Sequence, residues 1–131
     1  MSAAPPAVSQ VSSLAEILAA RAVVGRIYID DKIRDYIVDL VRATREPNAH
    51  GLVELAPLIE LGASPRASIY LATAARAHAF LRRRGYVTPD DIKAVAADVL
   101  RHRVMVSYEA EAEDIGADEL IRRLLTHIEV P

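Results

Sequence analysis

Apolar residues recur at helical spacing in segment after segment of this sequence, and this pattern restricts the possible folds more than any other feature. In residues 30–45 they stand at i, i+3, i+4, i+7 and i+8, after a capping residue at Asp30 or Asp31. The apolar positions are Ile33, Tyr36, Ile37, Leu40 and Val41. One buried face on each of several helices predicts a mainly all-α domain, built as a helical bundle.

Capping signals mark two further helices, and apolar residues mark a third. Ser13 and Glu16 form a capping box for a helix that ends at Gly25, and its apolar face consists of Leu14, Ile17, Leu18 and Ala22. A second helix begins after Thr88, and a third is expected over residues 117–127. Their expected buried residues are Ile92, Val95, Ala96, Val99 and Leu100, and Leu120, Ile121, Leu124 and Leu125.

The longest helix is expected from Pro65 to about Arg83, and apolar side chains that we expect to be buried cover most of its circumference. They are Ile69, Leu71, Ala74, Ala75, Ala77, Phe80 and Leu81. A helix that is apolar on most sides is usually central in its domain, and the alanines of this one allow close approach of its neighbours. The stripe expected to face water consists of Ala72, Arg76, Ala79 and Arg83. The arginines at 82–84 follow the helix, where positive charge opposes the negative end of the helix dipole.

The segments between the helices leave room for at most a two-stranded β patch. Residues 26–29 alternate, which predicts a short strand or an extended link, and residues 103–107 also look extended. If both segments are strands, we expect residues 103–107 to pair with residues 27–29. Residues 52–61 are expected to contain one short helical piece around Leu58, and the acidic residues 109–114 are expected to be solvated.

Composition excludes several classes of protein. The chain has 131 residues, 52% hydrophobic and 26% charged, which is typical of one globular domain. A net charge of −2 argues against a dedicated nucleic-acid binder, and the lack of cysteine excludes disulfides and thiolate metal sites. With no secretory signal and no membrane-spanning segment, we expect a cytoplasmic protein in which residues 1–11 are a flexible tail or linker.

The stretch from Leu61 to Ala67 combines helix-start signals with a basic residue. Gly62 tolerates the positive φ that ends a turn, Ser64 is a good N-cap, and Pro65 suits the first helical position. Arg66 then lies where free N–H groups and the helix dipole attract anions, and its forked guanidinium suits phosphate. Arg66 is therefore the candidate anion-binding residue, although the same pattern also serves ordinary helix starts.

No other pattern points to catalysis or to a metal, and we expect neither. The glycine-rich loops G-x-x-x-x-G-K-[S/T] and G-x-G-x-x-G, which hold nucleotide phosphates, are absent. The histidines lie on separate segments without zinc-site spacing; they are His50, His78, His102 and His127. The acid pairs at 30–31 and 90–91 are explained by helix capping. The run Arg101-His102-Arg103 either compensates a helix dipole or forms a basic knuckle that faces a partner.

Four motifs resemble, in the right order, the C-terminal lid domain of MoxR-family AAA+ ATPases. They are Tyr28–Arg45, Leu61–Ala67, Arg84–Ile92 and Val99–Arg103. The similarity extends from about Ser13 to Leu125, and four ordered motifs are far more specific than any one alone. The resemblance implies an AAA+ lid-type bundle of four to six helices over residues 12–131.

The resemblance also implies a function. In this family the Gly-Ala-Ser-Pro-Arg segment carries the sensor 2 arginine, so Arg66 would contact the γ-phosphate of ATP. The αβα core that binds ATP and Mg is absent from this sequence, so the chain alone should not be catalytic and should bind nucleotide barely or not at all. The implied partners are that core, neighbouring subunits of a ring, often a hexamer, and proteins with von Willebrand factor A domains. Such ATPases are chaperone-like and mature their partner proteins.

Two other functions compete with this reading. The chain could be an autonomous protein–protein interaction domain, in which Arg66 is an ordinary surface arginine without a nucleotide role. A histone-like DNA binder would also have a long central helix followed by the sequence of residues 86–91. The net charge of −2 argues against DNA binding, and we expect neither nucleic acid nor membrane as a partner.

Overall fold

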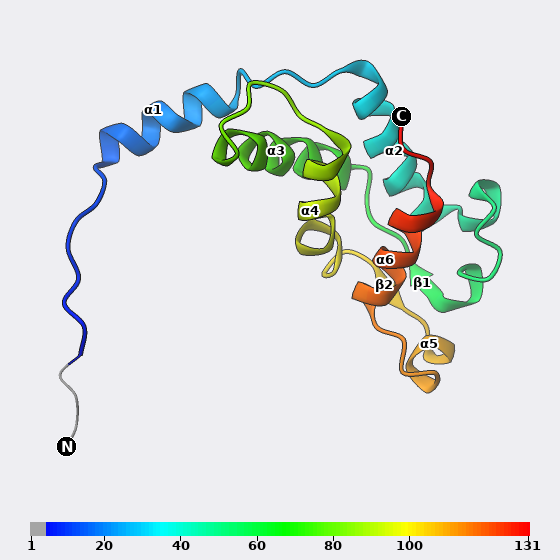
Figure 1. The fold of residues 1–131 in the computed structure, drawn as a ribbon. Coiled ribbons are helices and arrows are strands. Elements are labelled where there is room, and N and C mark those ends of the chain that lie inside the picture. Colours follow the sequence, from blue (N-terminus) through cyan, green and yellow to red (C-terminus); the bar gives the residue numbers. More distant parts are fainter. Residues whose placement is uncertain (1–4) are drawn as a thin grey trace.

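The computed structural model describes residues 5–131 of the chain (Figure 1). Within this range the chain forms six α-helices, which are α1 (Leu14–Val24), α2 (Asp31–Arg45), α3 (Arg66–Leu81), α4 (Pro89–Leu100), α5 (Tyr108–Ala112) and α6 (Ala117–His127). Two 3₁₀ turns, η1 (Pro47–His50) and η2 (Ala56–Leu58), and two strands, β1 (Ile59–Leu61) and β2 (Met105–Val106), complete it. The mainly all-α class and the small β patch are confirmed.

The predicted N-terminal ends of α1, α2 and α4 agree closely with the structure because side chains cap them. Helix α3 begins one residue later than predicted, at Arg66, with Pro65 and not Ser64 in the N-cap position. Ser13 and Glu16 make the expected capping box of α1, and Asp30 accepts a hydrogen bond from the Lys32 N–H at the start of α2. Thr88 and Asp91 form a second capping box, at the start of α4. Each cap satisfies backbone N–H groups that have no partner inside the helix.

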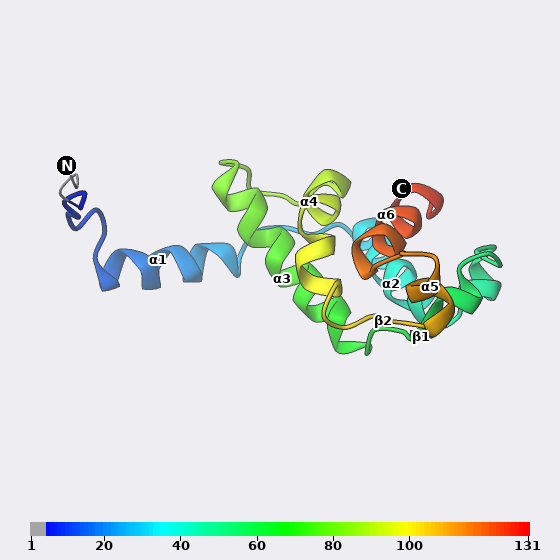
Figure 2. The same cartoon turned by 90° about the horizontal axis from the view of Figure 1, so that it is seen from below.

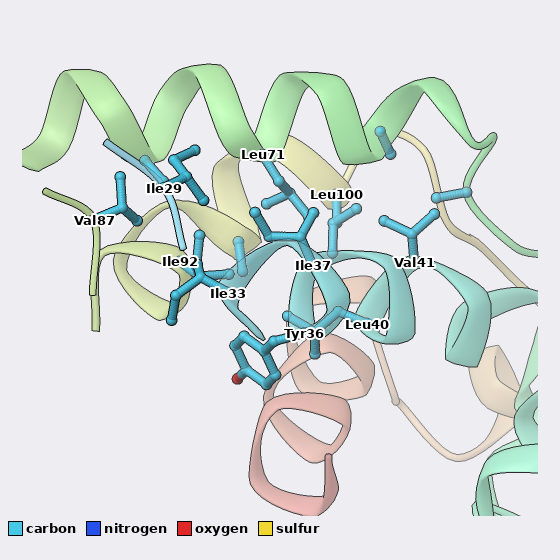
Figure 3. Packing of buried hydrophobic residues seen from close by; sticks show 14 of the residues in the cluster. Ile29, Ile33, Tyr36, Ile37, Leu40, Val41, Leu71, Val87, Ile92 and Leu100 are labelled. Atoms are coloured by element: carbon cyan, nitrogen blue, oxygen red, sulfur yellow. The ribbon is translucent and has the colours of Figure 1, made fainter. Parts of the chain in front are cut away.

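The main core lies where α2, α3 and α4 meet (Figure 3). Ile37 on α2 lies against Leu71 on α3, and Ile33 and Val41 on the same predicted face of α2 belong to this cluster. Ile92 and Leu100 of α4 close it. The buried face of α3 is made mostly of alanines, so neighbouring helices approach it closely. It consists of Ala67, Leu71, Ala75 and Ala79.

This face corrects the predicted orientation of α3. Ala79 was expected to face water but is completely buried, whereas Ile69 and Leu81 were expected to be buried and are 65% and 76% exposed. The apolar residues surround the helix, so their spacing could not show which side the other helices would cover. Thr73 is exposed, and its hydroxyl donates to the carbonyl oxygen of Ile69 at 2.9 Å.

A second, smaller core lies at the other end of the bundle. It joins the segment between α2 and β1 to α5 and α6 through Ala43, Leu52, Leu55, Leu58, Ala110, Leu120 and Leu124. The predicted buried residues of α6 are confirmed for Leu120, Ile121 and Leu124, while Leu125 is half-buried. The acidic segment expected to be solvated contains α5, which Ser107 caps by accepting from the Ala110 N–H at 3.2 Å.

The strand pairing differs from the prediction. Residues 105–106 pair antiparallel with Ile59–Leu61, in the segment that precedes α3, and not with residues 26–29 (Figure 2). Tyr28 instead makes a single parallel bridge to Tyr86. Only Ala56–Leu58 of the expected helical piece is helical, as a 3₁₀ turn, and Ile59 begins the strand. Short extended segments carry no signal for their partner, because tertiary packing decides which of them meet.

Helix α1 extends away from the bundle in both views (Figures 1 and 2). None of its residues is buried, and Leu14, Ile17 and Leu18 are all at least half exposed. The amphipathic face predicted for this helix therefore covers no core here. Residues 5–12 have no regular structure and are exposed, while residues 1–4 of the expected tail lie outside the described range.

Candidate anion site at the start of α3

The segment before α3 is held tightly against the end of α2. The Ala63 N–H donates to the hydroxyl of buried Thr44 at 2.9 Å, and that hydroxyl donates to the Val41 carbonyl oxygen at 2.6 Å. A Cβ added to Gly62 would lie 2.2 Å from the carbonyl oxygen of Thr44. Gly62 does not have the positive φ that we expected of it. Glycine is required here because two backbones meet, not because a turn needs it.

The first N–H groups of α3 already have partners within the chain. The Arg66 N–H donates to the Ser64 hydroxyl oxygen at 3.3 Å, the Ala67 N–H to the Ser64 carbonyl at 2.8 Å, and the Ser68 N–H to the Pro65 carbonyl at 3.1 Å. The expectation that free backbone N–H groups would bind an anion is therefore wrong. The helix dipole remains, and the donors available to an anion are side chains.

Arg66 is exposed and lines a pocket of about 460 Å³. The other residues that line this pocket are Arg45, Leu61, Gly62, Ser64, Tyr70 and Arg103. The lining includes three arginines and no carboxylate. None of these arginines takes part in an ion pair between residues 5–131. The pocket is therefore a concentration of uncompensated positive charge, which is what an anion site requires.

Two of the three arginines are anchored by neutral groups. Arg45 donates from Nη1 to the Ala63 carbonyl oxygen at 3.4 Å. Arg103 donates from Nη1 to the Val99 carbonyl oxygen at 2.6 Å, and its guanidinium lies 4.6 Å from the centre of the Tyr70 ring. Nη1 of Arg103 also contacts Nε2 of His102. These contacts hold the Arg103 side chain in place, and the long contact of exposed Arg45 restricts it only weakly, without neutralising either arginine.

Arg66 could be identified from the sequence, but Arg45 and Arg103 could not be placed beside it. Arg45 was treated only as the end of a helix. Arg103 belonged to the basic run 101–103, which the structure divides, because Arg101 pairs with Asp98 and Asp118 while Arg103 turns to the pocket. The one available signal was that both arginines fall inside motifs of the resemblance.

The most strongly perturbed carboxylate lies elsewhere, between α3 and α4. Asp91 is completely buried; it accepts two hydrogen bonds from Arg84, at 2.6 and 2.8 Å, and lies 2.6 Å from Nδ1 of His78. Thr88 donates to it from N–H and hydroxyl. Burial alone would raise the pKa of Asp91, but these hydrogen bonds, led by that of Arg84, hold it well below its ordinary value of 3.8. The capping prediction for this acid is confirmed, and its partners give it a structural role.

Within residues 5–131 no three His, Cys, Asp or Glu side chains gather where they could hold a metal ion. In that range no helix has both the length and the apolar character needed to cross a membrane. A pocket of about 510 Å³ adjoins the arginine pocket and shares Arg45, Leu61 and Gly62 with it, but Glu46 and Glu60 line it as well.

Comparisons with known proteins agree with this architecture. The family described as AAA lid domain matches residues 54–124. Chaperone MoxR1 of Mycobacterium tuberculosis is 36% identical over 131 residues, which is 100% of this chain and 35% of that protein. Protein MoxR of Paracoccus denitrificans is 40% identical over 105 residues, 76% of this chain and 31% of that protein. The crystal structure of a proposed ATPase from Cytophaga hutchinsonii is also similar, with a TM-score of 0.86 and 41% identity, over 89% of this chain and 36% of that chain.

The fold and the family match define the class of this molecule, a AAA lid domain. Within that class, the chain belongs to the lids of MoxR-family AAA+ ATPases, as its four motifs predicted. The chain spans about one third of the length of the curated relatives it matches.

Proposed function

We propose that this chain is the nucleotide-sensing lid of a MoxR-family AAA+ ATPase, with Arg66 as the sensor 2 residue that contacts the γ-phosphate of ATP. The observation that carries the proposal is the position of Arg66, exposed at the start of α3 in a pocket with three arginines and no carboxylate. Such a lining fits a phosphate group, because guanidinium groups donate paired hydrogen bonds to phosphate oxygens.

The segment that carries Arg66 is fixed to a second helix, as a sensor residue requires. The contacts of Gly62 and Ala63 with Thr44 join the start of α3 to the end of α2. A force on the Arg66 side chain would therefore move the two helices together rather than bend a loop. ATP, bound with Mg by a separate core, supplies the terminal phosphate that is transferred to water. When that phosphate leaves, Arg66 loses its partner and the lid is free to change its angle.

The remaining parts of the proposal follow from the family. The lid would pack on its own ATPase core and on neighbouring subunits of a ring such as a hexamer, in the cytoplasm. Its movements would drive a chaperone-like maturation of partner proteins, including proteins with von Willebrand factor A domains. The relative from Mycobacterium tuberculosis carries the name chaperone, which supports this class of activity.

The test is ATP hydrolysis by a fusion of this chain to the ATPase core of the Mycobacterium tuberculosis relative. Arg66→Ala should lower the rate about tenfold or more, since it removes a charged donor from the transferred phosphate. Arg82→Ala is the matched control, because Arg82 is also exposed and follows the opposite end of α3. If both variants hydrolyse ATP like the parent fusion, Arg66 is not a sensor, and the rival reading of an autonomous interaction domain gains support.

A further inference from the structure

We infer that Arg45 and Arg103 join Arg66 in one polyphosphate-binding pocket, so that the lid contacts at least two phosphate groups of the nucleotide through three arginines. The inference rests on the proposed function of Arg66 and extends it to two residues on other elements. Arg45 ends α2, Arg66 begins α3, and Arg103 follows α4.

The positive charges of the pocket have no compensating carboxylate in its lining. Three guanidinium groups around one pocket therefore repel one another. The chain does neutralise an arginine nearby, because Arg101 pairs with both Asp98 and Asp118. Leaving Arg103, two residues later, without an acidic partner keeps its charge available to a ligand.

The side chains of Arg45 and Arg103 are partly restricted before any anion binds. A guanidinium has five N–H donors. Arg45 uses one of its donors on the Ala63 carbonyl, and Arg103 binds the Val99 carbonyl and stacks on Tyr70. These neutral anchors restrict the Arg103 side chain, and more weakly that of Arg45, while most of their donors stay free. Less side-chain entropy is then lost when an anion binds.

The lining of the pocket also indicates the class of ligand. A lining of three positive charges matches an anion with several negative charges, and the phosphate chain of a nucleoside triphosphate has that charge and a linear shape. The backbone N–H groups at the start of α3 are already bonded, so the arginines must supply the contacts. An anion held by all three would connect α2, α3 and α4, the helices that form the main core.

The test uses the 131-residue chain and sodium tripolyphosphate at low ionic strength, with affinity measured by calorimetry. With Arg66 alone, the isolated chain is expected to bind nucleotide barely or not at all, whereas three arginines at low ionic strength should give weak but measurable binding. Arg45→Gln, Arg103→Gln and Arg66→Gln should each weaken it about tenfold, because each removes a charge-assisted hydrogen bond. Arg82→Gln removes the same charge from the far end of α3 and should change the affinity less than about twofold. In NMR spectra, the side-chain Nε–H signals of the three pocket arginines should shift on titration, and that of Arg82 should not.

The results separate this inference from the proposed function. If the wild-type chain does not bind tripolyphosphate, or if Arg45→Gln and Arg103→Gln bind it like wild type, the three-arginine pocket is refuted. The sensor role of Arg66 would still stand on its effect in the fusion protein. Conversely, loss of binding in all three variants together with unchanged hydrolysis by the Arg66→Ala fusion would support the pocket and refute the sensor role.

Discussion

Gly62 and Thr44 approach so closely that no side chain fits between them. The carbonyl oxygen of Thr44 occupies a point 2.2 Å from where a Cβ on Gly62 would lie, and the Thr44 hydroxyl accepts the N–H of the next residue, Ala63. This contact joins the end of α2 to the segment that carries Arg66. The geometry of the candidate site therefore depends on a glycine four residues before the arginine.

The first prediction concerns this contact. Gly62→Ala should lower the free energy of unfolding by about 3 kcal/mol, because the new methyl group meets backbone atoms that cannot move aside cheaply. Urea unfolding followed by circular dichroism measures the change. Gly85→Ala is the control, since a Cβ there meets nothing within 4 Å, and it should alter the free energy by less than about 0.5 kcal/mol. Equal effects of the two substitutions would contradict the proposed role of Gly62.

The second prediction concerns the buried carboxylate between α3 and α4. Asp91→Asn should cost about 3 kcal/mol of unfolding free energy at pH 7, because an amide cannot replace the charge-assisted hydrogen bonds that this buried carboxylate accepts from Arg84 and Thr88. Asp90→Asn is the matched control, because Asp90 is the exposed neighbour, and it should change little.

The same pair of variants tests the pH dependence. Since the pKa of Asp91 is lower in the folded than in the unfolded chain, its stabilising contribution is complete above the ordinary value of 3.8. The contribution is lost as the pH falls below that value towards the folded pKa. The difference between wild type and Asp91→Asn should therefore shrink from pH 5 to pH 3, and a constant difference would show that the pKa is not depressed.

The third prediction concerns the hydroxyl of Tyr36. This group is buried without a hydrogen-bond partner among the described residues (Figure 3), and burial raises the pKa of Tyr36, with a smaller contribution from Asp90. Tyr36→Phe should leave the fold intact and raise the free energy of unfolding by up to about 1 kcal/mol, because it removes an unsatisfied polar atom. Tyr28→Phe, which loses an exposed bond to Asp30, should not stabilise the protein. Destabilisation by Tyr36→Phe in thermal unfolding would show that the hydroxyl does have a partner.

The fourth prediction concerns α1. Deleting residues 1–24 should change the free energy of unfolding by less than about 1 kcal/mol, because no residue of α1 is buried. Ile27→Ala, only three residues beyond the deletion, should cost about 2–4 kcal/mol, because Ile27 belongs to the main core. If the truncated chain unfolds far more easily than the full chain, then α1 contributes to the bundle in solution.

Much of the fold could be predicted from local signals. The limits of α2, α4 and α6 follow from the caps at Asp30 and Thr88 and from apolar residues at helical spacing, and these signals act within a few residues of the chain. Helix α5 was missed because its five residues are too few for a periodic pattern. The buried side of α3 was assigned wrongly because a helix that is apolar all round does not indicate its neighbours.

For the candidate site, the sequence by itself determined one residue, Arg66, because a helix-start signal and a forked cation are adjacent there. Only the tertiary structure brought Arg45 and Arg103, which are 58 residues apart in the sequence, to the same pocket. It also decided that Gly62 serves a backbone contact and that residues 105–106 pair with β1. Helix caps and helix-start signals depend on residues that are neighbours in the sequence, so a short stretch of sequence is enough to recognise them. Contacts between distant segments depend on how the helices pack, and no short stretch of sequence determines that packing.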